Sequence, residues 1–116
     1  MNYFIAPGLI TTHPKQALMD RLTKHVSYIH ATTPDQVKSK TRIKNVKDAR
    51  FECMYLLKKT TNMTLAYIGD YYNRDHASVL HAVQTIDNEQ EYDRDLKGRI
   101  RELKKHFGIQ EVIKNN

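Results

Sequence analysis

The chain has 116 residues, of which 40% are hydrophobic and 28% are charged, and its formal net charge is +6 at pH 7. A chain of this length and ordinary globular composition is expected to form one domain with a modest core. No run approaches the ~20 apolar residues that span a bilayer, and the single cysteine, Cys53, excludes a disulfide framework and a zinc site built on cysteine pairs. An intracellular, cytoplasmic protein is therefore expected.

Residues 1–13 are predicted to form an N-terminal extension to this domain. The segment is apolar, but it has no basic start and is broken by Pro7 and Gly8, so it is a poor signal peptide. Its apolar side chains can pack on the domain or on a partner, and the sequence leaves both arrangements open.

A helix is expected to begin at Pro14, because proline is favoured at the first position of a helix. The apolar residues that follow recur at helical spacing and share one face: Leu18, Leu22, Val26 and Ile29. Thr33, followed three residues later by Gln36, forms a capping box that predicts a short second helix. Asn45 is expected to cap a third helix, whose inward face carries Val46, Ala49, Cys53, Leu56 and Leu57.

Three more helices are expected before residue 109. Thr64 and Asp75 are suited to cap the fourth and the fifth of them. The apolar stripe of the fifth is Val79, Ala82, Val83 and Ile86, and that of the sixth is Leu96, Ile100, Leu103 and Phe107, with Gly108 as its stop. Because no strand alternation runs longer than a few residues, the pattern predicts an all-α fold of about six helices over residues 14–108, followed by a tail at 109–116.

Residues 65–88 are typical of a helix-turn-helix. Arg74, Asp75 and His76 stand at the start of the second helix, whose N-terminal end enters the major groove of DNA in such motifs. Residues 38–59 hold eight lysines and arginines against two acids, an excess of +6 that equals the net charge of the whole chain. A basic segment beside a helix-turn-helix suits a polyanion such as DNA, although the same composition also fits a solvated helix face.

The same region carries a longer signature, formed by Ile68, Gly69, Arg74, Asp75, His76, Val79, His81 and Ala82. In this run the chain resembles the C-terminal box-binding domain of the bacterial replication initiator DnaA. The resemblance covers roughly residues 16–107 and includes the family's Ser-Lys-x-Arg segment, here Ser39-Lys40-Thr41-Arg42. It implies an all-α domain with a helix-turn-helix, similar in fold to the DnaA C-terminal domain and to the Trp repressor.

The resemblance also implies a contact with double-stranded DNA for each matching residue. Arg42 is expected in the minor groove, where a narrow A·T tract concentrates negative potential. Base edges in the major groove are assigned to Arg50, Asp75, His76, Ala77 and Ser78, with the fork of Arg50 suited to guanine and the carboxylate of Asp75 to cytosine. Phosphates are assigned to Lys40, Lys44, Lys58 and Arg74, which fix register rather than sequence.

Three departures from the family pattern concern the same surface. The family usually has Phe-Gly-Gly before its arginine, whereas this chain has Tyr72-Asn73 and is one residue shorter. Asparagine tolerates the left-handed conformation that glycine would supply, so a tight turn is still expected. Asp48 stands where the family tends to be basic, and Phe51 replaces a polar residue near the groove. These changes leave the DNA-binding role in place and the recognised base sequence open.

The 116 residues contain no G-x-x-x-x-G-K-[ST] run, the phosphate loop of the ATPase module of DnaA. The sequence therefore predicts a stand-alone, nucleoid-associated accessory or regulator of replication initiation, with one molecule on each box and replication proteins as further partners. A transcriptional repressor, and an adaptor whose basic face binds an acidic protein, are the alternatives. No catalytic residue, cofactor or metal is expected, since His76 and His81 are five residues apart and fall on different faces of a helix.

Overall fold

The computed structural model describes residues 14–107. The predicted extension at 1–13, the stop at Gly108 and the tail at 109–116 lie outside the described residues. Within them the chain forms six helices and no strand: α2 (Pro14–Ile29), α3 (Pro34–Val37), α4 (Lys44–Thr60), α5 (Leu65–Tyr72), α6 (His76–Glu89) and α7 (Arg94–His106). The all-α class and the six predicted helices are confirmed.

Side-chain caps explain where most of these helices begin. Thr33 accepts a hydrogen bond from the backbone N–H of Gln36 at the start of α3, and Thr64 does the same for Tyr67 in α5. Asp75 caps α6 by accepting from the N–H of Ser78 at 2.8 Å. Each cap satisfies one of the backbone donors that have no partner inside the first turn. The caps expected at the second, fourth and fifth helices are confirmed.

The start of α4 differs from the prediction. Ile43, not Asn45, is the residue that precedes the helix, and its side chain makes no capping bond. Asn45 lies within the first turn, where its amide donates to the backbone carbonyl of His30 at 2.8 Å. The cap assigned to Asn45 was therefore wrong, because this side chain fastens the end of α2 to α4 instead.

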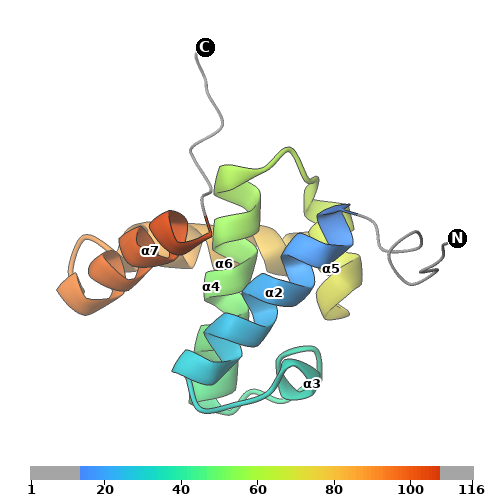
Figure 1. Ribbon diagram of the computed structural model, residues 1–116, viewed down its shortest axis with the longest axis horizontal. Coiled ribbons are helices and arrows are strands. Elements are labelled where there is room, and N and C mark those ends of the chain that lie inside the picture. Colours follow the sequence, from blue (N-terminus) through green and yellow to red (C-terminus); the bar gives the residue numbers. More distant parts are fainter. Residues whose placement is uncertain (1–13, 108–116) are drawn as a thin grey trace, which may run out of the picture.

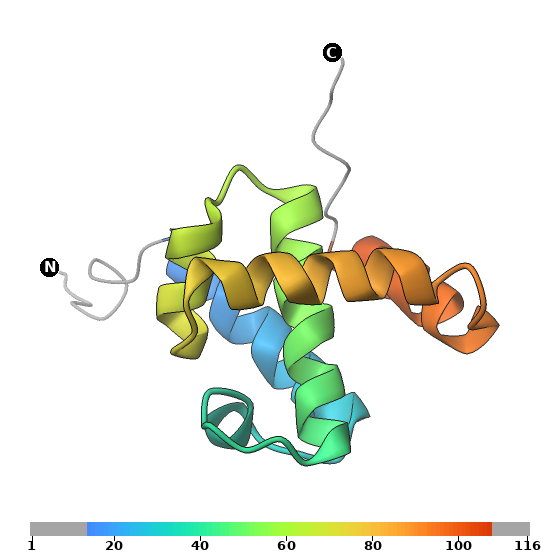
Figure 2. The ribbon, with the colours of Figure 1, turned by 180° about the vertical axis from the view of Figure 1, so that it is seen from behind.

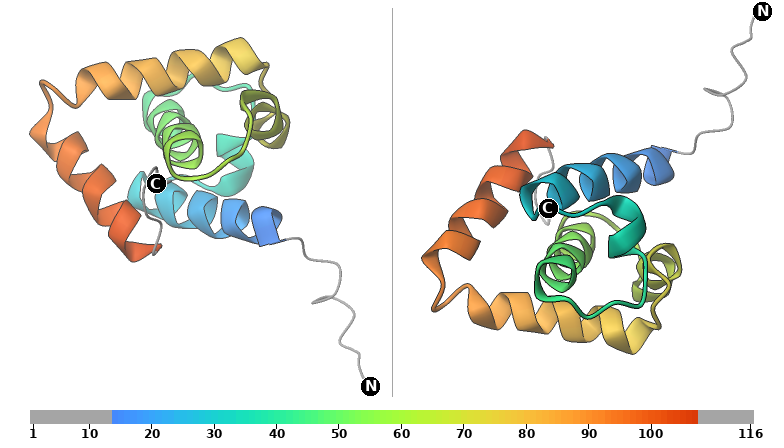
Figure 3. Two further views of the ribbon diagram at one scale, coloured as in Figure 1. Left: turned by 90° about the horizontal axis from the view of Figure 1, so that it is seen from above. Right: turned by 90° about the horizontal axis from the view of Figure 1, so that it is seen from below.

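Helix α4 is the centre of the domain. It contacts each of the other five helices, and its residues 52–57 are buried without interruption. A helix buried all round can only be a core element. The inward residues expected for it, Val46, Ala49, Cys53, Leu56 and Leu57, are all buried, and burial raises the pKa of the Cys53 thiol to about 12. Helices α2 and α6 lie on opposite sides of α4 (Figures 1 and 3).

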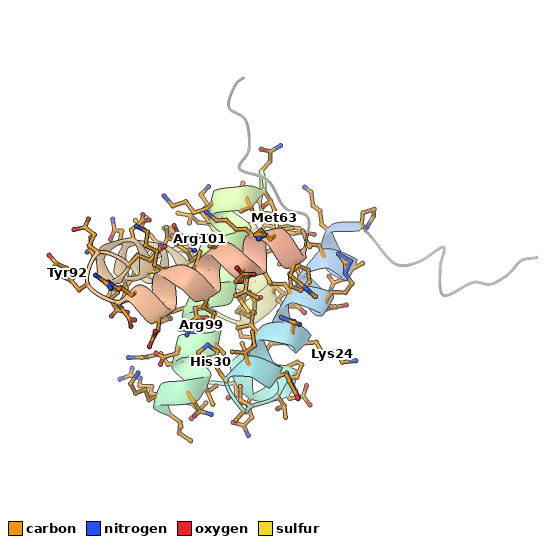
Figure 4. The ribbon with its side chains drawn as sticks, turned by 60° about the vertical axis from the view of Figure 1, so that its left-hand side comes forward. Lys24, His30, Met63, Tyr92, Arg99 and Arg101 are labelled. Carbon is orange, nitrogen blue, oxygen red and sulfur yellow. The ribbon has the colours of Figure 1, made fainter. Side chains whose placement is uncertain are left out.

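A buried carboxylate joins three helices at this centre. Glu52 of α4 is 1% exposed, and it accepts hydrogen bonds from the guanidinium of Arg99 in α7 at 2.8 and 3.0 Å. The Nε2 atom of His30, just after α2, lies 3.0 Å from Glu52 Oε1. Figure 4 shows Arg99 and His30 next to each other where α7 and α2 flank α4. Burial alone would raise the pKa of Glu52, but the hydrogen bonds from His30 and Arg99 outweigh it and leave that pKa below its usual value.

Candidate nucleic-acid interface

The turn between α5 and α6 is built on a left-handed residue. Asn73 has φ 59° and ψ 44°, a conformation that asparagine adopts more readily than other residues with a side chain. The N–H of Arg74 then donates to the carbonyl of Gly69 at 2.8 Å, which closes the end of α5. The tight turn expected in spite of the missing glycines is confirmed, and it leads directly into the capped N-terminus of α6 (Figure 2).

Gly69 allows this turn to fold back against α5. A Cβ atom added at position 69 would lie 2.4 Å from the carbonyl oxygen of Arg74. That distance is far inside van der Waals contact, and the oxygen belongs to the backbone of the turn. Glycine is therefore required at position 69 by the angle between α5 and α6.

The turn is tied to the segment that precedes α4. The side-chain amide of Asn73 donates to the carbonyl of Lys38 at 3.1 Å, and the ammonium of Lys40 donates to the carbonyl of Asn73 at 2.8 Å. Arg74 adds a bond from Nη2 to the carbonyl of Ser39 at 2.9 Å. The start of α6 and the residues around Arg42 are thus held together by hydrogen bonds.

Arg50 of α4 fastens the segment before α4 through hydrogen bonds to its backbone carbonyls. Its side chain donates from Nε to the carbonyl of Val37 at 2.7 Å, and from Nη2 to the carbonyls of Ser39 and Thr41 at 3.1 Å each. The residue is 3% exposed, and burial, followed by the charge of Arg74, lowers its pKa to about 10. Because Nε and Nη2 are used on three backbone carbonyls, we propose a structural role for Arg50 in place of the base contact expected from the sequence.

This revised role has a measurable consequence. Arg50→Ala should destabilise the domain by about 1–3 kcal/mol, because the carbonyl of Val37 loses its donor in a buried place. Affinity should fall equally for all DNA sequences, since the segment carrying Arg42 is loosened. Chemical denaturation and binding titrations on matched duplexes check both effects, with Lys47→Ala as the control for loss of charge. Unchanged stability with a loss confined to one guanine would restore the base-reading role.

A groove of about 770 Å³ lies between the entry to α4 and the exposed side of α6. It is lined by Arg42, Lys47, Arg50, Phe51, Arg74, Asp75, Ala77, Ser78, His81 and Thr85. Six of the ten residues predicted from the sequence are thus brought together at one place. His76 lies at the exposed first position of α6, outside this lining.

The three predicted lysines are also outside the groove. Lys40 is held on the turn, as described above, and Lys44 pairs with Asp48 at 2.7 Å on the exposed side of α4. Lys58 lies near the opposite end of α4, where its ammonium is 3.5 Å from the carbonyl of Met63. Exposed cations that lie outside the groove suit phosphates along a duplex better than bases.

Sequence reasoning assigned no contact to three residues that line the groove: Lys47, Phe51 and Thr85. Lys47 and Phe51 stand one helical turn apart on α4, and His81 and Thr85 repeat that spacing on α6. The ring of Phe51 meets that of His81 edge to face, with 5.8 Å between centroids, and the ammonium of Lys47 lies 5.7 Å from the Phe51 centroid. The helical spacing of four was the signal that could have found Lys47 and Thr85.

Two further findings concern what the described residues contain. No group of three or more His, Cys, Asp or Glu side chains between residues 14 and 107 is placed to hold a metal ion. None of the helices in that range has the length and apolar character needed to cross a membrane.

Comparison with known proteins gives one consistent family. The family model described as "Bacterial dnaA protein helix-turn-helix" matches residues 19–86. Chromosomal replication initiator protein DnaA of Caldanaerobacter subterraneus subsp. tengcongensis is 29% identical over 99 residues, which cover 85% of this chain and 22% of the relative. For DnaA of Thermodesulfovibrio yellowstonii the identity is 32% over 91 residues, with 78% and 21% covered. The chain spans about a fifth of the length of these curated relatives.

Proposed function

Because this chain belongs to the bacterial DnaA helix-turn-helix family of DNA-binding domains, we propose that it binds double-stranded DNA sequence-specifically at sites resembling the DnaA box. The observation that carries the proposal is the groove beside the N-terminal end of α6, with its basic and polar lining. In helix-turn-helix proteins this end of the second helix lies in the major groove. The cations around it supply the phosphate contacts on which affinity for DNA depends.

Four residues at the start of α6 are proposed to read base edges: Asp75, His76, Ala77 and Ser78. The backbone N–H of Ser78 holds the pKa of Asp75 below its usual value, so its carboxylate stays ionised and can accept from cytosine N4. His76 is exposed at the first position of the helix and can donate to a base. The methyl of Ala77 suits a thymine methyl, and the hydroxyl of Ser78 suits a base or a phosphate.

Arg42 is proposed to enter the neighbouring minor groove. It is exposed, it lines the same groove as Asp75, and the segment that carries it is fixed to the turn before α6. Lys40, Lys44, Lys58 and Arg74 are proposed to contact phosphates on either side and so to set the register of the protein on the duplex.

A binding titration tests this function. The protein is titrated into duplexes that carry a DnaA box, a scrambled box or random sequence, at two salt concentrations. Preference for the box together with steep salt dependence is the expected result. Binding without preference would contradict the sequence-specific reading, and absence of binding at low salt would contradict the function as a whole.

Substitutions separate base reading from phosphate contact within this surface. His76→Ala should cost ~1–3 kcal/mol at one base position and relax specificity there. Lys58→Ala should weaken binding to all sequences alike and reduce the slope of log K against log salt by ~1. Competition titrations with single-base variants of the box measure both. If His76→Ala weakened every sequence equally, its assignment to a base would fail.

We further propose that this binding serves replication initiation, on the nucleoid and without catalysis by the chain itself. One molecule on each box would regulate access to an origin or assist replication proteins there. Replication of an origin plasmid by a purified initiator should change when the wild-type protein is added and should not change with His76→Ala. Equal effects of the two proteins would exclude a role through box recognition.

A further inference from the structure

A second basic surface lies across α4 from the recognition helix. It is a pocket of about 650 Å³ between α2 and the end of α7. Arg21, Lys24, His25, Tyr28, His106 and Phe107 line this α2–α7 pocket. Figure 3 shows α2 and α6 on opposite sides of α4, so a duplex held by α6 leaves the α2–α7 pocket open. The DNA-binding function gives this surface no task.

The pocket has an aromatic floor and a cationic rim. The rings of His25 and His106 stack with 4.4 Å between centroids, and Phe107 meets His25 edge to face at 5.5 Å. Burial, and then the charge of His106, lowers the pKa of His25. Arg21 and Lys24 are exposed at the rim, and the Arg21 guanidinium lies 5.8 Å from the Phe107 centroid. Such a pocket suits an aromatic side chain that is flanked by carboxylates.

The same chain presents that combination elsewhere. The turn between α6 and α7, residues 90–93, contains Glu91 and Asp93, and with the adjoining helix ends residues 87–95 hold five acids and one arginine. Tyr92 stands in it and is 86% exposed, more than any other large hydrophobic side chain between residues 14 and 107. The turn itself is ordered, since the N–H groups of Tyr92 and Asp93 both donate to the carbonyl of Glu89, at 3.0 and 2.9 Å. Its fold therefore displays Tyr92 between Glu91 and Asp93 without covering it.

The acidic turn cannot reach the pocket of its own molecule. Helix α7 separates the two, and its 13 residues span about 20 Å at the helical rise. Figure 4 shows Tyr92 and Lys24 at opposite ends of the domain, each pointing outward. Two surfaces of complementary charge that face apart in one molecule can meet only between two molecules.

We propose that copies of this chain associate head to tail, with Tyr92 of one copy seated in the α2–α7 pocket of the next. Glu91 of the first copy then lies against Lys24 of the second, and Asp93 against Arg21. The contact joins two different surfaces, so it does not close on itself and can continue from copy to copy. On DNA, the head-to-tail contact links molecules that are bound to sites pointing in the same direction. This consequence rests on the DNA-binding function proposed above.

Cooperativity on paired sites tests the contact. The protein is titrated into duplexes with one DnaA box, two boxes as a direct repeat, or two as an inverted repeat, over a series of spacings. On the best direct repeat we expect cooperativity of about tenfold, the size that one buried aromatic contact with flanking ion pairs supplies. The inverted repeat should show none, because a head-to-tail contact has a direction.

Charge reversal supplies a rescue. Lys24→Glu, Glu91→Lys and Tyr92→Ser should each abolish the cooperativity and leave single-box affinity unchanged. The double variant Lys24→Glu with Glu91→Lys should recover it, since the pair is restored with its signs exchanged. Arg101→Glu is the matched control, because Arg101 is exposed on α7 and does not line the pocket.

Each other outcome overturns the contact. Equal cooperativity on both repeats, no rescue in the double variant, or an equal loss with Arg101→Glu would each refute it. Intact single-box binding without cooperativity would also refute it and leave the DNA-binding function standing. If single-box binding itself fails, the contact between copies is tested by sedimentation of the same variants without DNA. Only wild type, Arg101→Glu and the double variant should then self-associate.

Discussion

Replacing Glu52 by alanine is expected to lower the free energy of unfolding by about 3–5 kcal/mol, the range found when one partner of a buried ion pair is removed. The substitution leaves the guanidinium of Arg99 and the ring of His30 without the carboxylate that both contact. It also removes the link that holds α7 and the end of α2 against α4. Urea denaturation followed by circular dichroism measures the effect.

Asp48→Ala is the matched control on the same helix. Asp48 pairs with Lys44 at 2.7 Å, but the lysine side chain is 84% exposed. Loss of this ion pair should therefore lower the free energy of unfolding by at most ~1 kcal/mol. Equal costs for Asp48→Ala and Glu52→Ala would show that burial adds nothing to the central pair and would contradict this account.

The contribution of Glu52 to the free energy of unfolding also depends on pH in a definite direction. Its pKa is lowered in the folded protein, so the stabilisation is complete above the unfolded value of ~4.3 and is lost as pH falls through the folded value. The stability difference between wild type and Glu52→Ala should therefore be constant near neutral pH and shrink in acid below about pH 4. A stability difference between the two proteins that grew on acidification would refute the lowered pKa of Glu52.

Replacing Gly69 by alanine should cost about 1–3 kcal/mol of stability and more than about tenfold in DNA affinity, because the added methyl must displace the turn backbone. The nearest atom, the carbonyl oxygen of Arg74, is 2.4 Å from the new Cβ. That carbonyl belongs to the turn that leads into α6, so relief of the clash also moves the residues that are proposed to read bases.

Gly98→Ala provides the opposite result in the same chain. Gly98 lies inside α7, and nothing stands within 4 Å of a Cβ placed there. Alanine in the interior of a helix is favoured over glycine by about 1 kcal/mol, so this variant should be more stable and bind DNA normally. Thermal unfolding and box titrations on the two variants decide the matter. A Gly69→Ala protein with wild-type affinity would show that the turn can adapt.

Local signals in the sequence predicted most of the helices because they act within a few residues. Thr33, Thr64 and Asp75 cap the helices that they were expected to cap. The motif Gly69-to-His76 located the turn, and Asn73 took the left-handed conformation that its residue type permits. In each of the three caps, the backbone N–H that the side chain accepts from is only three residues away.

Long-range contacts account for what the sequence did not predict. Asn45 bonds to a carbonyl 15 residues away instead of capping its helix, and Arg50 is used on carbonyls 9 to 13 residues away instead of pointing outward. Glu52, one of the two acids among residues 38–59, is paired in the core with Arg99 of α7, 47 residues away. The periodicity of a sequence does not show which distant group will contact a side chain. The roles of these three residues are all set by such distant contacts.

The bonds around Ser39 bear on what kind of duplex can fit. Arg50 and Arg74 both donate to the carbonyl of this one residue, so the segment that carries Arg42 and the first turn of α6 keep a fixed separation. In the proposed complex Arg42 lies in the minor groove and α6 in the major groove, and these hydrogen bonds hold the two DNA contacts at one distance from each other. Sequences whose local twist and groove width match that separation bind without deformation energy. Base pairs between the two contact points would then influence affinity although no side chain touches them.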